Sequence, residues 1–87
     1  MSTFKLNIAS PNGNVFSGEV ERIMLRGADG DLAILAGHIP FTTTVVPCDF
    51  YIILPDGKRQ NGTVKGGLLT VSSEEVTLLS GNAALND

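Results

Sequence analysis

The amino-acid sequence predicts an all-β fold, a flattened β-sandwich or barrel of roughly eight to ten short strands in two sheets. Apolar or β-branched segments of strand length recur at short intervals, and clusters of Gly, Pro, Asn and Asp separate them. No segment combines an N-cap residue with an apolar stripe at helical spacing. Because 87 residues have room for one domain, residues 1–87 are expected to form a single β-sandwich.

The first strand and turn follow from the N-terminal residues. Residues 4–8 alternate apolar and polar side chains, a pattern typical of a half-buried strand. The apolar side chains of Phe4, Leu6 and Ile8 are therefore expected to face the core. Residues 11–14, Pro-Asn-Gly-Asn, predict a turn, because proline fixes φ and glycine accepts a positive φ.

The next segment is less regular. Residues 15–16 start a second short strand, which Gly18 is expected to interrupt. Residues 19–26 predict a third strand, in which the apolar phase slips between Glu21 and Arg22. Such a slip fits a β-bulge at that point. A helix is the alternative for this segment, but it is short and lacks a capping box.

The middle of the chain reads as strand, turn, strand. Residues 29–30, Asp-Gly, predict a tight turn, and residues 32–35 form an apolar run of strand length. Residues 37–40, Gly-His-Ile-Pro, break this run because proline lacks the N–H that a sheet needs. Residues 42–46 are β-branched and predict another strand, which Pro47 ends or places at an edge.

A hairpin is expected in the second half. Residues 50–54 are apolar at every position, so both faces of that strand are expected to be covered. Residues 55–58, Pro-Asp-Gly-Lys, predict the hairpin turn, and residues 58–64 return as a polar strand that faces solvent. Residues 66–67, Gly-Gly, predict a bend or a close approach of two backbone segments.

The C-terminal residues predict one more hairpin. Residues 68–71 and 76–79 are its two strands, joined by a Ser-Ser-Glu-Glu turn. Residues 81–82, Gly-Asn, are expected to end the regular structure. Residues 83–87 tolerate a helix, but they are too few to hold one without support.

Composition excludes several classes of function. A net charge of -3, with six Lys and Arg spread along the chain, argues against a nucleic-acid binder. No apolar run approaches the ~20 residues that span a bilayer, and no signal peptide is expected. Together with a lone cysteine, Cys48, this indicates a reducing, intracellular setting. Since 43% of residues are hydrophobic and 17% are charged, the fold is expected to keep apolar surface for a partner.

Catalytic and cofactor sites are not expected. His38 has no neighbouring acid or nucleophile, so a turn histidine at a surface is the better interpretation. Cys48 has no nearby positive charge in sequence, which indicates an inert thiol. Asp29 and Asp31 provide too few oxygens for calcium. Neither a cofactor nor a metal is therefore predicted.

The sequence resembles the N-terminal β-sandwich domain of the epsilon subunit of F-type ATP synthase, called delta in mitochondria. The resemblance rests on an opening strand at residues 4–8, a Phe-Ser-Gly segment at 16–18 and a Gly-Gly segment at 66–71 with a closing strand. Its most specific element is residues 30–41, Gly-Asp-Leu-Ala-Ile-Leu-Ala-Gly-His-Ile-Pro-Phe. Ala36 stands where the family usually has proline.

The resemblance implies a non-catalytic rotor subunit, peripheral on the cytoplasmic face of the bacterial inner membrane or its organellar equivalent. Such a subunit docks on gamma and the c-ring without inserting in the membrane, and couples ion translocation to ATP synthesis. By position in the family, the residues expected to face the c-ring are Gly30, Asp31, Gly37 and His38. An apolar side around Ile39, Phe41 and Val45 is expected to contact gamma.

The sequence ends at Asp87, whereas the family usually continues into a helical hairpin. Inhibition of ATP hydrolysis and ATP binding, which the family assigns to that hairpin, are therefore not expected here. The alternative function is a free-standing β-sandwich that binds a small ligand or peptide, although the chain has no Trp and one Tyr to line a groove. A small hydrolase is a more distant alternative.

Overall fold

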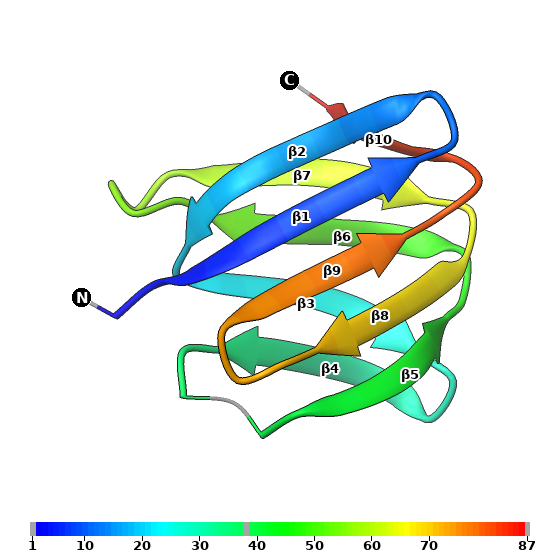
Figure 1. The fold of residues 1–87 in the computed structure, drawn as a ribbon. Helices are drawn as coiled ribbons and strands as arrows, with labels where there is room; N and C mark the ends of the chain where they lie inside the picture. Colours follow the sequence, from blue (N-terminus) through cyan, green and yellow to red (C-terminus); the bar gives the residue numbers. More distant parts are fainter. Residues whose placement is uncertain (1, 38, 87) are drawn as a thin grey trace.

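Ten β-strands and no helix make up the described part of the chain, residues 2–37 and 39–86 of a computed structural model. Figure 1 shows a front layer of β2, β1, β9, β8 and β5 packed against β7, β6, β3 and β4, with β10 behind β2. The strands are β1 (Phe4–Ser10), β2 (Gly13–Val20), β3 (Arg22–Gly27), β4 (Gly30–Leu35), β5 (Phe41–Val45), β6 (Cys48–Ile53), β7 (Arg59–Val64), β8 (Gly67–Val71), β9 (Glu75–Leu79) and β10 (Ala83–Asn86). The predicted all-β sandwich is confirmed.

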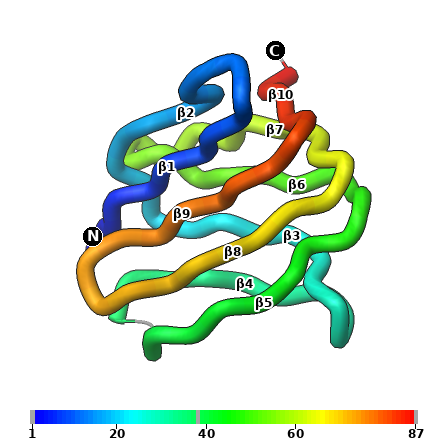
Figure 2. The backbone as a smooth tube through the Cα atoms, turned by 45° about the vertical axis from the view of Figure 1, so that its right-hand side comes forward, coloured from blue at the N-terminus to red at the C-terminus, as the bar shows by residue number. Residues whose placement is uncertain are grey.

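Hydrogen bonds join the strands into one path across both layers, in the order β10-β7-β6-β3-β5-β8-β9-β1-β2, and β4 pairs with β3 beside this path. β3 makes the connection between the layers. It pairs with β6 of the back layer through residues such as Met24, whereas Gly27 at its end pairs with Val45 of β5. Figure 2 shows β5 rising from the bottom of the front layer to reach the end of β3.

The core lies between the two layers. Phe4, Leu6 and Ile8 of β1 point into it and are buried, as the alternation of the first strand predicts. Burying one such side chain favours folding by roughly 1.5–3 kcal/mol, so this cluster is the main attraction between the layers. The buried apolar residues are Phe4, Leu6, Ile8, Val20, Ile23, Leu25, Ile34, Val45, Phe50, Ile52, Val64, Leu69, Val71, Val76 and Leu78.

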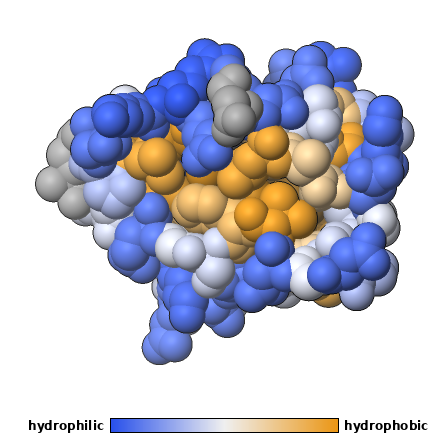
Figure 3. Space-filling view, turned by 90° about the horizontal axis from the view of Figure 1, so that it is seen from above, coloured by the Kyte–Doolittle hydropathy of each residue, from blue (hydrophilic) through white to orange (hydrophobic). Residues whose placement is uncertain are grey.

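The two ends of the path, β2 and β10, lie close together at the top of the sandwich. No pairing joins them within the described residues, so the barrel is nearly closed but keeps a seam. Val15 and Phe16 of β2 and Ala83 and Leu85 of β10 are half-buried against the core. Seen from above, Figure 3 shows an apolar area with polar residues around it. The half-buried side chains of β2 and β10 cover the core at the seam, where, among the described residues, the two strands are not joined by backbone hydrogen bonds.

The turns fall where the sequence predicts them. Gly30 and Gly57 have φ of 120° and 87°, values that side chains other than glycine rarely adopt. In the second of these turns, the N–H of Gly57 donates to the carbonyl of Leu54 at 2.8 Å. Asp56 Oδ1 accepts from the N–H of Lys58 at 3.0 Å, the side-chain contact that favours aspartate in turns.

The predicted bulge and interruption near residues 18–22 are wrong. β2 continues through Gly18 to Val20, and the chain bends at Glu21 before β3 begins at Arg22. The apolar phase slips here because the chain leaves the front layer for the back layer, so the buried Val20 and Ile23 face the core from opposite sides. The register irregularity of the first hairpin lies elsewhere, between Ile8 and Ala9.

Two further expectations need correction. Regular structure does not end at residues 81–82, because β10 adds to the free edge of β7 as an antiparallel strand. Four residues carry too little pattern to reveal a strand that tertiary pairing creates. The strand at residues 50–54 is covered on one face rather than two, since Phe50 and Ile52 are buried while Tyr51 and Ile53 are half-exposed on the outer face.

The predicted close approach at the Gly-Gly segment is confirmed. The backbone of Gly67 lies against the carbonyl of Leu79, so a Cβ added at Gly67 would overlap that oxygen. Beside it, the buried hydroxyl of Ser80 donates to the carbonyl of Gly66 at 2.5 Å. The same hydroxyl accepts from the N–H of Asn82 at 3.1 Å. This end of the sandwich is held by backbone contact and one buried hydroxyl.

Gly67→Ala is expected to lower the free energy of unfolding by about 1–3 kcal/mol, because its methyl group has no room beside Leu79. Gly81→Ala is the matched control, since a Cβ there meets nothing within 4 Å. It should change stability by about 0.5 kcal/mol or less. Urea denaturation of both variants measures the difference, and equal losses would contradict the close approach.

Candidate docking surfaces

Three of the four residues expected to face the c-ring lie in the described part of the chain, at two separate turns. Gly30 and Asp31 begin β4 at its turn with β3, and Gly37 follows the other end of β4. At about 3.3 Å per residue, the strand between them holds the two turns roughly 20 Å apart. His38 lies outside the described residues. The structure therefore places Gly30, Asp31 and Gly37 at the two ends of β4, along one edge of the sandwich rather than in one cluster (Figure 1).

β4 is the strand that forms this edge. Among the described residues it pairs with β3 alone, so the backbone groups of its other side are free for a partner. A hollow of about 300 Å³ lies between β4 and β5 and is lined by Asp29, Gly30, Asp31, Leu32, Phe41, Thr42 and Thr43. Carboxylates, hydroxyl groups and open backbone give the β4 edge the means to hydrogen-bond polar loops.

Asp31 is held by its cross-strand neighbour Arg26. The Nε of Arg26 donates to Oδ1 of Asp31 at 2.8 Å. This hydrogen bond and the charge of Asp31 raise the pKa of the Arg26 guanidinium above its ordinary value. Because both side chains are well exposed, the pair adds little to stability, and it mainly orients the carboxylate at the start of β4.

The residues expected to contact gamma differ in accessibility. Ile39 is 80% exposed and Phe41 is 40% exposed, so both present apolar surface beside β5. Val45 is 4% exposed and belongs to the core. Its side chain faces inward because it occupies the inward parity of β5, opposite Gly67 of β8. Val45 therefore cannot offer its side chain to a partner in this fold.

Sequence reasoning missed a larger apolar surface on the outer face of the front layer. Leu68 and Leu79 are cross-strand partners in β8 and β9, and they are 39% and 48% exposed. Leu79 also pairs with Ala9 of β1, which extends the row across three strands. The signal was present in the doubled leucines at 68–69 and 78–79, because one of two neighbouring strand residues must point outward.

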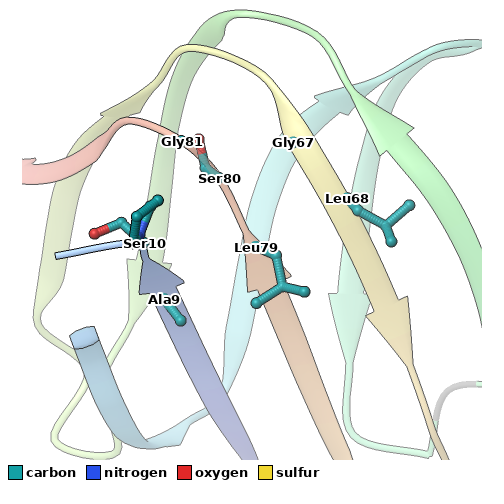
Figure 4. Close-up of a pocket in the computed structure, with 8 residues that line it drawn as sticks. Ala9, Ser10, Gly67, Leu68, Leu79, Ser80 and Gly81 are labelled. Carbon is teal, nitrogen blue, oxygen red and sulfur yellow. The ribbon is translucent and has the colours of Figure 1, made fainter. Parts of the chain in front are cut away.

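These residues line a shallow groove of about 540 Å³ (Figure 4). We call it the apolar groove. Leu68 and Leu79 project from neighbouring strands onto the same face in the close-up. None of the lining residues is charged, and the lining consists of Ala9, Ser10, Pro11, Gly67, Leu68, Leu79, Ser80 and Gly81. The groove is suited to apolar contact with another macromolecule.

A metal centre and a membrane span are absent from the part of the chain that the structure describes. Within residues 2–37 and 39–86, no three His, Cys, Asp or Glu side chains gather as metal ligands would. Over the same residues there is no helix with the length and apolar character needed to cross a bilayer. Cys48 is a free, half-buried thiol.

Comparison with known proteins gives a consistent result. Residues 3–86 match the family described as ATP synthase, Delta/Epsilon chain, beta-sandwich domain. The chain is 45% identical over 78 residues to the sodium ion specific ATP synthase epsilon chain of Acetobacterium woodii, covering 90% of this chain and 59% of that protein. It is 39% identical over 82 residues to the ATP synthase epsilon chain of Bacillus velezensis, covering 92% and 60%.

Solved structures share the fold at low sequence identity. A chain of the Euglena gracilis mitochondrial ATP synthase aligns with a TM-score of 0.90 at 20% identity, covering 98% of this chain and 54% of that one. A chain of the Tetrahymena thermophila mitochondrial enzyme, from its central stalk and c-ring, aligns with a TM-score of 0.76 at 12% identity, covering 94% and 66%. The chain thus spans about three fifths of the curated relatives it matches. It belongs to the β-sandwich family of ATP synthase delta/epsilon chains.

Proposed function

We propose that this chain is a non-catalytic part of the ATP synthase rotor, which docks on gamma and on the c-ring and couples ion translocation to ATP synthesis. The supporting observation is the pairing of an apolar groove on the front layer with a polar edge along β4. The groove lies toward the upper right of Figure 1 and β4 at the bottom, so two partners can bind at once.

Gamma is assigned to the front layer. The apolar groove offers Leu68 and Leu79, and Ile39 adds exposed apolar surface just before β5. Phe41 is exposed as well, but it has the inward parity of Val45 and lines the hollow between β4 and β5. Interfaces of standard size bury about 800 Å² on each partner, which needs more than the two residues at β5. The row of Ala9, Leu79 and Leu68 adds apolar contact area across β1, β9 and β8, strands that the sequence did not point to as a gamma contact.

The c-ring is assigned to the β4 edge, from Gly30 and Asp31 at one end to Gly37 at the other, and His38, the next residue in the sequence, stays part of the proposed contact. An edge roughly 20 Å long fits several loops of a ring better than it fits one side chain. Polar contacts of this kind fix register more than they add affinity. Since packed interiors hardly compress, the sandwich can pass torque from one surface to the other.

On this proposal the chain is peripheral to the membrane, on the cytoplasmic side in a bacterium or the equivalent side in an organelle. The alternative, a free-standing ligand- or peptide-binding module, draws on the same groove, whose volume is within the range of small-molecule sites. Such sites place a few polar groups against the ligand, whereas the apolar groove is shallow and lined without charge. The apolar groove therefore suits contact with a protein surface better than binding of a small ligand.

The double variant Leu68→Gln, Leu79→Gln is expected to fold normally and to bind gamma from its own source at least tenfold more weakly. The reason is that two exposed apolar anchors lose their contact area. Titration calorimetry with purified gamma measures the affinity. Leu35→Gln is the matched control, an exposed leucine of β4 outside the groove. A double variant that binds like the unchanged chain, or a Leu35 variant that binds as weakly, would contradict the assignment.

Asp31→Asn is expected to leave the melting temperature of the isolated chain nearly unchanged, because the carboxylate is exposed. In membranes with reassembled ATP synthase it should lower ion pumping per ATP hydrolysed. Glu19→Gln, an exposed carboxylate of β2 in the front layer, is the control and should pump normally. If both variants lower the number of ions pumped per ATP hydrolysed, or if neither does, the assignment of Asp31 to the c-ring is contradicted.

A further inference from the structure

The arginines of this chain are scattered in sequence but lie on one face of the fold. Arg22 and Arg26 belong to β3 and Arg59 to β7, and all three point outward from the back layer. Cross-strand pairing places Ile53 of β6 between Arg22 and Arg59. Tyr51, the one tyrosine in the sequence, lies two residues earlier on the same side of β6. We call Arg22, Tyr51, Ile53 and Arg59 the arginine face.

The ring of Tyr51 organises two of these cations. The guanidinium carbon of Arg59 is 3.9 Å from the ring centroid, and that of Arg22 is 5.9 Å from it. Both distances fall within the range of cation–π attraction. The Nε of Arg59 also donates to Oδ1 of Asn61 at 2.9 Å, and its two terminal amino groups form no hydrogen bond with other described residues. Two guanidinium groups are thereby held beside one ring in a defined orientation.

These two cations lack an anionic partner. Within residues 2–37 and 39–86, Arg26 forms an ion pair with Asp31, while Arg22 and Arg59 form none. Two like charges near one ring repel each other unless a counter-ion joins them. A carboxylate suits a guanidinium because two parallel N–H donors match its two oxygens. The arginine face is therefore poised to receive carboxylates.

The surroundings favour a polypeptide over a free anion. Met24 and Ile53 supply apolar contact beside the cations, and Arg, Tyr and Met are the residue types enriched at protein interfaces. Hollows of about 190 and 390 Å³ lie beside Tyr51, room for side chains of a bound segment. Asp49 lines both hollows, so they suit the uncharged side chains of such a segment, and the segment's carboxylates belong at the arginines.

We propose that the arginine face binds an acidic segment of a partner protein in extended conformation, with carboxylates on Arg22 and Arg59. Alternate residues of an extended strand point the same way about 6.6 Å apart, a spacing that suits two cations beside one ring. This inference goes beyond the proposed function, because gamma and the c-ring are assigned to the front layer and the β4 edge. The back layer then contributes a third contact.

The test uses a short blocked peptide in which glutamate and valine alternate, added to isotope-labelled chain and followed by NMR. Signals of the Arg22 and Arg59 side chains and of Tyr51 should shift, and added salt should weaken binding. Arg22→Gln or Arg59→Gln should each weaken binding about tenfold, since each removes one charge-assisted contact. The double variant should abolish it.

Three controls decide the outcome. Lys5→Gln, which removes an exposed cation of β1 in the front layer, should bind the peptide nearly as the unchanged chain does. A peptide with glutamine in place of glutamate should not bind. The double variant Leu68→Gln, Leu79→Gln should bind normally, which separates this result from the gamma assignment. Absence of binding, equal loss in the Lys5 variant, or equal binding of inorganic phosphate or phosphatidylglycerol vesicles would overturn the proposal.

Discussion

The structure depends on how β3 shares its hydrogen bonds. One edge of this strand pairs with β6 near Arg22 and with β5 near Gly27, while its other edge pairs with β4. Since β5 and β6 belong to different layers, the strand that both bond to must stand at the corner between them. The chain passes from the front layer to the back layer at the bend at Glu21, before β3, and again at Pro47, between β5 and β6. The buried cluster then closes the layers on each other.

Much of this fold follows from local pattern. Alternation at residues 4–8 gives the inward side chains of β1, and Pro-Asp-Gly-Lys at 55–58 gives the hairpin of β6 and β7. Local pattern fails where a strand exists because of a distant partner. β10 forms on the edge of β7, and the phase slip near Glu21 reflects a change of layer that only the assembled core defines.

The candidate surfaces show a similar division. Family resemblance selected turn residues such as Asp31 and Gly37, and the apolar run predicted between them is the strand β4, which holds them at opposite ends of one edge. Parity within a strand decides that Val45 faces the core, whereas it leaves Leu68 and Leu79 on the surface. The arginine face was hidden for another reason. Its members come from three strands, so their proximity depends on sheet order rather than on spacing in the sequence.

Three surfaces thus surround one thin core: the apolar groove, the β4 edge and the arginine face. A cryo-electron microscopy map of ATP synthase assembled with this chain tests the arrangement most directly. The account predicts the groove of Leu68 and Leu79 against gamma, the β4 edge over the c-ring loops, and Tyr51 turned away from both. A map that places the back layer on gamma, or β4 away from the ring, would contradict it.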